Sequence, residues 1–216
     1  MNAALAEAKR KPGRPRDEGL QTRRRTEILE EATRVFSERG FAATDVQVVA
    51  NRLGVGKGTV YRYFPSKEKL FLAAVDFAMT QLRAAVDEAA GKAALPLDRV
   101  AAGVKAYLAF FDKHPEVVEL LIQERAQFRD RKQPTYFQHR DANLGPWQML
   151  FRGLIADGVI RRIPVKRITN VISDLLYGTM FTNYLSGRKQ SLARQSDDVL
   201  DILFRGLLAA PAEAAT

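Results

Sequence analysis

Hydrophobic residues recur along most of this chain with the spacing of amphipathic helices. Val46, Val49, Ala50 and Leu53 stand at positions i, i+3, i+4 and i+7, which places them on one face of a helix. No stretch sustains the strict alternation that is typical of a strand, and no repeat with a period of about 20 to 50 residues is visible. The pattern therefore predicts an all-α fold.

Glycine, proline and polar residues divide this pattern into separate helices. Gly40 and Gly187 are expected to end helices, because glycine adopts the left-handed conformation of a helix C-terminus at little cost. Pro115 is expected at the first position of a helix, where its missing N–H is tolerated. The predicted helices cover about residues 22–39, 46–53, 57–64, 66–90, 97–112, 115–128, 143–157, 165–186 and 192–209, with a loop or frayed helix at 129–141.

Residues 53–69 read LGVGKGTVYRYFPSKEK, and the N-terminal third is organised around them. Residues 57–64 give about two helical turns, with Val60 and Phe64 on one face. Pro65 then stops this short helix, and Ser66 can cap the next one. A short helix with a buried spine and a basic, hydroxyl-rich outer surface suits a DNA groove.

The segment before this short helix completes a helix-turn-helix. Thr44 is predicted to cap the earlier helix, with Gln47 three residues later as the second half of a capping box. Gly54, Gly56 and Gly58 could alternatively form a phosphate-binding loop, but such loops follow a strand, whereas an apolar helical stripe precedes these glycines. The spacing therefore favours a helix, a glycine turn and a short second helix.

Three stretches in order and spacing resemble the TetR family of bacterial transcriptional regulators. They read ILEEA at residues 28–32, FSERGFAAT at 36–44 and GVGKGTVYRYFPSK at 54–67, and the resemblance covers roughly residues 22–75. Gly56 departs from the family pattern, which more often carries Ser at this position. Because Gly caps a helix only a few tenths of a kcal/mol less well than Ser, this departure does not threaten the resemblance.

The resemblance implies two domains and a set of DNA contacts. Residues 21–67 would form the helix-turn-helix DNA-binding domain and residues 68–210 a helical ligand-binding and dimerisation domain, with the helix from about residue 66 joining them. The residues expected to hold phosphates are Thr44, Tyr61 and Lys67. The residues expected to face the major groove are Lys57, Gly58, Thr59, Arg62 and Tyr63.

The charge distribution supports a nucleic-acid partner. The formal net charge is +9, and residues 1–70 hold 15 basic and 9 acidic side chains against 19 and 16 in the rest of the chain. The excess therefore lies in the third that carries the helix-turn-helix. Because the chain has no cysteine, no apolar run of membrane-spanning length and no signal-peptide core, a cytoplasmic protein without disulfides is expected.

Residues 1–20 are expected to form a disordered basic arm. The segment KRKPGRPR at residues 9–16 is kept extended by its prolines, and its Gly-Arg-Pro core resembles the minor-groove-binding AT-hook, although Pro12 stands where that motif has Arg. A solvated charged tail is the alternative. The position directly before a DNA-binding fold favours DNA contacts by Arg14 and Arg16 in narrow A·T-rich minor grooves.

Catalytic and metal-binding chemistry is not expected. His114 and His139 lie far apart in the sequence and have no His or Glu at metal-ligand spacing, so each is expected at the surface or at a helix end. Asp197 and Asp198 are expected to be exposed helix charges, and no nucleophile or triad motif is present. The sequence therefore predicts no cofactor and no enzyme.

Aromatic residues are frequent on the C-terminal helices. Plain core packing explains any one of them, but the resemblance implies a ligand cavity between these helices. The polar residues expected in such a cavity are Gln148, Thr179 and Asn183. The aromatic residues expected to line it are Tyr107, Phe110, Phe111, Trp147, Phe151, Tyr177 and Phe181.

The last two helices carry more apolar residues than one buried stripe requires. Leu176 and Leu203 exemplify these residues, and Gly178 would allow two helices to approach closely. Burial on two sides is expected, with one side facing a second copy of the chain, and the resemblance implies a four-helix dimer interface.

These features predict a repressor that binds a palindromic operator as a homodimer and is released by a small-molecule effector. The alternative from another class is an architectural DNA-binding protein that uses the basic arm without a ligand. A short palindromic footprint would favour the regulator, and a nearly sequence-independent footprint would favour the architectural protein. The sequence leaves open the operator, the effector, the regulated genes and the sign of regulation.

Overall fold

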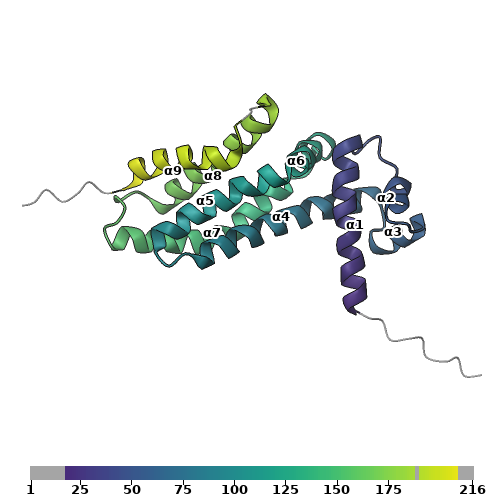
Figure 1. Cartoon of the computed structure of the whole chain (residues 1–216), viewed down its shortest axis with the longest axis horizontal. Helices are drawn as coiled ribbons and strands as arrows, with labels where there is room; N and C mark the ends of the chain where they lie inside the picture. Colours follow the sequence, from purple (N-terminus) through teal and green to yellow (C-terminus); the bar gives the residue numbers. More distant parts are fainter. Residues whose placement is uncertain (1–17, 188–189, 209–216) are drawn as a thin grey trace, which may run out of the picture.

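The helical pattern is confirmed in the computed structural model, which describes residues 18–187 and 190–208 and has no strand in these ranges (Figure 1). A single antiparallel bridge joins Ile160 to Leu208. Arg14 and Arg16 lie outside the described residues. The helices are α1 (Glu18–Arg39), α2 (Val46–Arg52), α3 (Lys57–Tyr63), α4 (Lys67–Lys92), α5 (Pro96–Lys113), α6 (Pro115–Gln127), α7 (Thr135–Ala156), α8 (Val165–Ser186) and α9 (Leu192–Leu207).

The helices form a head of α1, α2 and α3 at one end of the molecule and a bundle of α5 to α9 at the other (Figure 1). The long helix α4 runs from the head into the bundle and packs against α1, α5, α6 and α7. Helix α6 also packs against α1. The head is therefore attached to the bundle through α4 and α6 together.

Four phenylalanine rings form the core of this attachment. Phe36 of α1, Phe41 of the following turn, Phe71 of α4 and Phe128 after α6 pack on one another with ring centroids 5.1–6.0 Å apart, in both stacked and edge-to-face pairs. Aromatic pairs at these separations contribute beyond the burial of their area. One continuous apolar core thus runs from the head into the bundle, and a smaller cluster around Phe151 closes the far end.

Two predicted helix starts are wrong. Asp45, not Thr44, caps α2: its extended backbone precedes the helix and its carboxylate accepts the Gln47 N–H at 2.8 Å. Helix α7 begins at Thr135 rather than near residue 143 and contains Pro146 in its interior. Its start is set by a residue distant in sequence, because Glu124 of α6 accepts the Thr135 N–H at 3.0 Å.

The other boundaries differ by a few residues. Helix α1 begins at Glu18, so residues 18–20 belong to it and not to the predicted disordered arm, and α4 continues to Lys92, beyond its predicted end near residue 90. Gly40 and Gly187 have positive φ angles of 79° and 58° and follow the ends of α1 and α8, as expected for left-handed glycine. None of the described helices is long and apolar enough to cross a membrane.

Candidate functional site

The head presents the short helix α3 at the surface with the predicted spine beneath it. Val60 is fully buried and Phe64, which caps the helix, is almost fully buried. The remaining α3 positions are exposed or half-buried: Lys57, Gly58, Thr59, Tyr61, Arg62 and Tyr63. The side chains expected to contact DNA therefore lie on the outer surface of α3, although their contacts with DNA stay a prediction.

An ion pair fixes the first residue of α3. The Lys57 ammonium lies 2.7 Å from a carboxylate oxygen of Asp45, and both side chains are at least one-third exposed. The hydrogen bond from the Gln47 N–H, and next that from Lys57, lower the pKa of Asp45, and the bond to Asp45 raises the pKa of Lys57. This surface therefore places a carboxylate beside one of the cations expected in the major groove.

Two residues expected to hold phosphates are engaged inside the head. The Thr44 hydroxyl donates to the carbonyl of Gly40 at 2.7 Å, and Thr44 is only 3% exposed. The Lys67 ammonium donates to the carbonyls of Phe41 and Thr44, at 2.9 and 3.1 Å, and to that of Ala42 at 3.2 Å. These contacts give both residues a structural role in the turn between α1 and α2, and their contacts with phosphates stay a prediction.

A second ion-pair group holds α2 against α1. The Arg52 guanidinium lies within salt-bridge distance of Glu31 and Glu38, both on α1. The hydrogen bonds to these two carboxylates raise the pKa of Arg52 further above its usual range. Sequence reasoning gave Arg52 no role, because only the fold brings residues 14 and 21 positions apart together.

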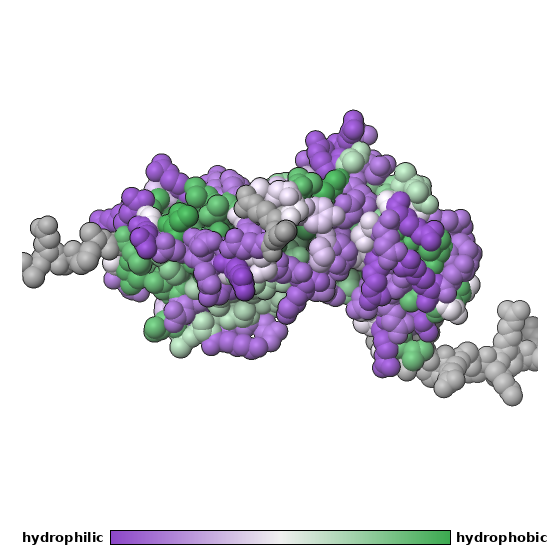
Figure 2. All heavy atoms as spheres, turned by 45° about the horizontal axis from the view of Figure 1, so that its top comes forward, coloured by the Kyte–Doolittle hydropathy of each residue, from purple (hydrophilic) through white to green (hydrophobic). Residues whose placement is uncertain are grey.

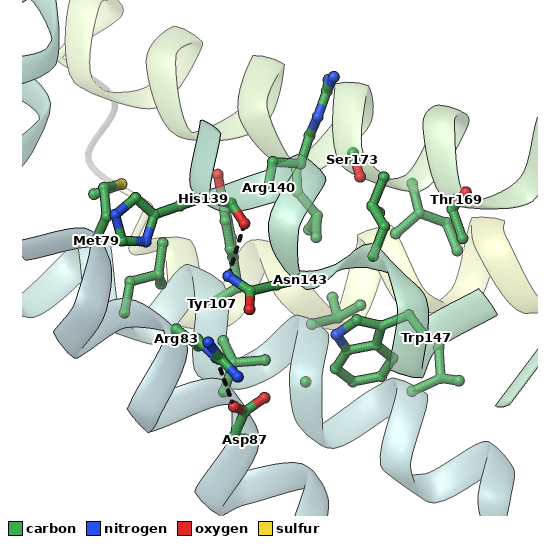
Figure 3. Close-up of a pocket in the computed structure, with 18 of the residues that line it drawn as sticks. Met79, Arg83, Asp87, Tyr107, His139, Arg140, Asn143, Trp147, Thr169 and Ser173 are labelled. Carbon is green, nitrogen blue, oxygen red and sulfur yellow. Dashed lines mark hydrogen bonds and ion pairs between the residues drawn. The ribbon is translucent and has the colours of Figure 1, made fainter. Parts of the chain in front are cut away.

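A cavity of about 170 Å³ lies in the bundle between α4, α5, α7 and α8 (Figure 3). Its walls are mainly apolar, and Met79, Leu82 and Val86 of α4 contribute to them. Its polar groups come from several helices: Arg83 pairs with Asp87 at 3.2 Å on α4, Asn143 of α7 donates to the His139 carbonyl at 2.7 Å, and Thr169 and Ser173 of α8 lie across from them (Figure 3). An apolar chamber with a few polar groups is the usual form of a small-molecule site.

Two tyrosine hydroxyls meet inside this chamber. Tyr107 of α5 and Tyr136 of α7 are almost fully buried, and their hydroxyl oxygens lie 2.9 Å apart. Burial raises the pKa of Tyr136 to about 12 and raises that of Tyr107 as well. Both phenols are therefore neutral at physiological pH, and each satisfies the other in an otherwise apolar wall.

Trp147 enters the chamber opposite a glycine. A Cβ atom added to Gly103 of α5 would lie 2.5 Å from Cη2 of the Trp147 indole. Only glycine therefore lets the indole ring lie where it does, directly against the α5 backbone. The predicted position of Trp147 in the cavity is supported by its place in the wall (Figure 3).

The other predicted cavity residues divide between cavity and core. Tyr107, Trp147 and Phe151 line the chamber. Phe110 and Phe111 are buried in the main core away from it, and Phe181 packs on Tyr177 with ring centroids 4.6 Å apart. The residues predicted from the sequence that do not line the chamber are Phe110, Phe111, Tyr177, Phe181, Gln148, Thr179 and Asn183.

Sequence reasoning missed the contribution of α4 and of the first half of α7. His139, expected at a surface or helix end, lies within α7, lines the chamber and places Nε2 2.8 Å from the carboxylate of Asp76 on α4. The signal that could have found this wall is the apolar spacing of Met79, Leu82 and Val86, which continues well beyond the head.

Helices α8 and α9 expose apolar side chains on the outside of the bundle (Figure 2). Val171 and Leu185 on α8 and Ile202 on α9 are between 55% and 70% exposed. Leu176 and Leu203, expected in a dimer seam, are instead buried within this chain. The apolar residues of these helices thus do face two sides, but the outer side is made by other residues than those predicted.

No group of three or more His, Cys, Asp or Glu side chains in the described ranges could hold a metal ion. His114 lies at the start of α6, 3.1 Å from Glu116, and Asp197 is exposed and pairs with Lys105 at 2.8 Å. Both positions agree with the structural roles expected for these residues.

Comparison with known proteins gives a family for the head. Residues 28–74 match the family model described as "Bacterial regulatory proteins, tetR family". The chain is 30% identical over 114 residues to the uncharacterised transcriptional regulator YerO of Bacillus subtilis, and the aligned region covers 51% of this chain and 39% of YerO. It is 32% identical over 131 residues to the transcriptional repressor KstR2 of Mycobacterium tuberculosis, covering 58% of this chain and 62% of KstR2. The chain thus spans less than two thirds of these relatives.

Solved structures share the whole fold. The ketosteroid regulator KstR2 of Mycobacterium tuberculosis superposes with a TM-score of 0.65 at 24% identity, over 87% of this chain and 96% of that one. The regulator FadR of Bacillus subtilis, solved with stearoyl-CoA, gives 0.69 at 20% identity, over 84% and 98%. At these identities the likeness establishes the fold. The named relatives are transcriptional regulators, in agreement with the prediction that this chain is not an enzyme.

Proposed function

Because this chain belongs to the TetR family of bacterial regulatory proteins, we propose that it is a repressor that binds a palindromic operator as a homodimer and releases it when a small molecule enters the chamber. The head from residue 21 to 67 would bind DNA and residues 68–210 would bind the effector and the second copy. The arm that precedes α1, with Arg14 and Arg16, would add minor-groove contacts.

Helix α3 supports the DNA-binding part of this proposal. Its outer surface carries Lys57, Arg62 and the half-exposed Tyr61 over a buried spine. Arg62 is exposed, so it is free to reach a base edge, whereas Tyr61 suits a phosphate contact. Thr44 and Lys67 form hydrogen bonds within the turn between α1 and α2, so α3 would supply most of the DNA contacts in the described part of the head.

The observation that carries the regulatory part of the proposal is the course of α4. Its first turns supply Leu70 and Phe71 to the core beneath the head, and its later turns supply Met79 and Leu82 to the chamber wall. A ligand that prefers a different placement of α4 therefore also changes the placement of the head. An architectural DNA-binding protein would have no need of such a chamber.

The exposed faces of α8 and α9 support the homodimer. Three large apolar side chains, Val171 and Leu185 of α8 and Ile202 of α9, are exposed on these adjacent helices, and a second copy would remove such side chains from water. Two heads held by such a dimer would read two half-sites about one helical turn, or a multiple of one turn, apart.

Titrations of effector and DNA test this proposal. Fluorescence anisotropy would follow a labelled duplex taken from the DNA beside the gene, and Trp147 emission would follow the effector. A long-chain acyl thioester is the first candidate, because FadR, which shares the fold, was solved with stearoyl-CoA. We expect the effector to weaken operator binding by about 5- to 150-fold, and the operator to weaken effector binding by the same factor.

A pair of variants provides the control. Phe151→Ala removes a chamber wall and should impair the response to effector, whereas Phe181→Ala removes a ring that lies outside the chamber and should leave the response intact. Both variants should bind the operator normally without effector. An effector that releases DNA equally from both variants would show that it binds somewhere else.

A further inference from the structure

A second cavity, of about 540 Å³, lies beside the first and has a different chemistry. It is formed by the last turn of α6, the loop to α7, the first turn of α7 and Tyr177 of α8. Four cationic side chains line it: Arg125, Arg129, Arg131 and Lys132. Nothing in the DNA-binding or regulatory scheme above uses these residues.

Half of this positive charge is not neutralised within the described part of the chain. Arg131 lies 3.0 Å from the buried carboxylate of Glu124, so these two charges neutralise each other. Arg125 donates to the Arg129 carbonyl at 3.3 Å, and neither Arg129 nor Lys132 forms an ion pair in the described ranges. The nearby Asp130 offsets only one of the three remaining cations. The cavity is therefore suited to a ligand group with several negative charges.

Aromatic rings separate this basic cavity from the apolar chamber. Tyr136 lines both cavities, with its hydroxyl bonded to Tyr107 on the chamber side. Its ring packs on Tyr177 with centroids 4.7 Å apart, and Phe137 packs beside them. Only the Tyr136 side chain is common to the two linings, so a shift of this ring would join the two cavities.

We propose that the effector is an amphiphile: its apolar chain occupies the chamber, and its phosphate-rich head group binds Arg125, Arg129 and Lys132 in the basic cavity. This inference rests on the effector role proposed above. Guanidinium and ammonium groups are the side chains that bind phosphate oxygens most strongly. A ligand bound in this way would extend past Tyr136 from the chamber into the basic cavity. Its phosphate groups would lie at the C-terminal end of α6, next to the DNA-binding head of the protein.

The basic cavity is connected to the head through α6. Gln123 donates to the Phe36 carbonyl of α1 at 3.0 Å, and the Phe128 ring packs on Phe41 and Phe71 with centroids 5.2 and 5.6 Å apart. Gln123 and Phe128 lie shortly before the basic loop of residues 129–132 in the sequence. Movement of the loop on binding an anion would thus be passed to α1 and α4, which gives the head group a route to the DNA-binding surface besides the one through the chamber.

Direct binding measurements without DNA test this inference. The full chain is titrated with octanoyl-, dodecanoyl- and stearoyl-coenzyme A, with the corresponding free fatty acids and with coenzyme A alone, and binding is followed by calorimetry and Trp147 emission. The Arg129→Ala/Lys132→Ala variant removes two exposed cations without disturbing the Arg131–Glu124 pair. The Arg161→Ala/Arg162→Ala variant removes two exposed arginines from the loop at the other end of α7.

We expect at least one acyl-coenzyme A to bind wild type more tightly than both its fatty acid and coenzyme A. The Arg129→Ala/Lys132→Ala variant should bind that thioester about tenfold more weakly, while fatty-acid binding and the control variant remain unchanged. Wild type that binds no thioester more tightly than its two parts would overturn the inference, as would an unchanged affinity in the variant. Coenzyme A that binds as tightly as the thioester would show a site for a free polyphosphate instead.

Operator binding separates this inference from the proposed function. The Arg129→Ala/Lys132→Ala variant should bind operator DNA like wild type in the absence of ligand. A loss of ligand-free operator affinity would show that these cations contact DNA, and the inference would be wrong. Normal operator binding by a protein that prefers no thioester would contradict the inference alone and leave the DNA-binding proposal standing.

Discussion

Replacement of Lys67 by methionine separates a structural role of this residue from the DNA contact that its position in the sequence suggested. The Lys67 ammonium donates to three carbonyls of the turn between α1 and α2 and lies 4.6 Å from the centroid of the Phe41 ring. Methionine keeps the unbranched apolar part of the side chain, without the ammonium group, and removes all three hydrogen bonds. The substitution therefore removes the hydrogen bonds that hold the start of α4 against this turn.

The magnitude follows from the exposure of the three carbonyls. A hydrogen bond with one charged partner contributes about 1.5–3 kcal/mol when its loss leaves the other partner unpaired. The bond to Ala42 is exposed and those to Phe41 and Thr44 are part-buried, so water can replace at least one of them. We expect a loss of about 2–3 kcal/mol in the free energy of unfolding.

Urea unfolding followed by far-ultraviolet circular dichroism measures this loss, which should lower the midpoint by about 1 M. Lys69→Met is the matched control: Lys69 is exposed on the same helix, and its replacement should change the free energy of unfolding by no more than about 0.5 kcal/mol. Equal midpoints for the two variants, together with weaker operator binding by Lys67→Met alone, would refute the structural role and restore the phosphate contact.

Three further substitutions test other parts of the account. Gly103→Ala places a methyl group 2.5 Å from the present position of the Trp147 ring, so the indole must move into the chamber. Trp147 emission should therefore change and effector affinity should fall about tenfold, while operator binding is retained. Asp45→Asn keeps a good helix cap but frees Lys57, so operator affinity should rise and the slope of log K against log salt should steepen by about one unit. Ile202→Asp places a charge on an exposed apolar position, so sedimentation analysis should show folded monomers in place of dimers.

The fold and the helix-turn-helix could be predicted from the sequence because both depend on local patterns. The spacing of Val60 and Phe64 is enough to define the buried side of a two-turn helix, and both residues are buried as expected. The left-handed glycines Gly40 and Gly187 mark helix ends through their own backbone conformation. Such features require no knowledge of which helices pack together.

The roles of individual polar and aromatic residues could not be predicted in the same way. Lys67 and Thr44 are committed to carbonyls that the fold brings to them, and the start of α7 is set by Glu124, 11 residues earlier. Tyr107 and Phe111 lie on the same helix, but the one reaches the chamber and the other the core. Because residues four apart share one face of a helix, this difference depends on where along α5 the chamber ends, which the spacing of its own residues does not determine.

The most direct test of the central claim, DNA recognition by a dimer through α3, is selection of binding sites from a pool of random DNA duplexes. We expect enrichment of a twofold-symmetric site whose half-sites lie about one helical turn, or a multiple of one turn, apart, bound by two copies of the chain. We also expect Arg62→Ala to change the preferred bases within each half-site. Enrichment of no sequence at all would contradict DNA recognition through α3. An unchanged preferred sequence for Arg62→Ala, together with undiminished affinity for Tyr61→Ala, would contradict it as well.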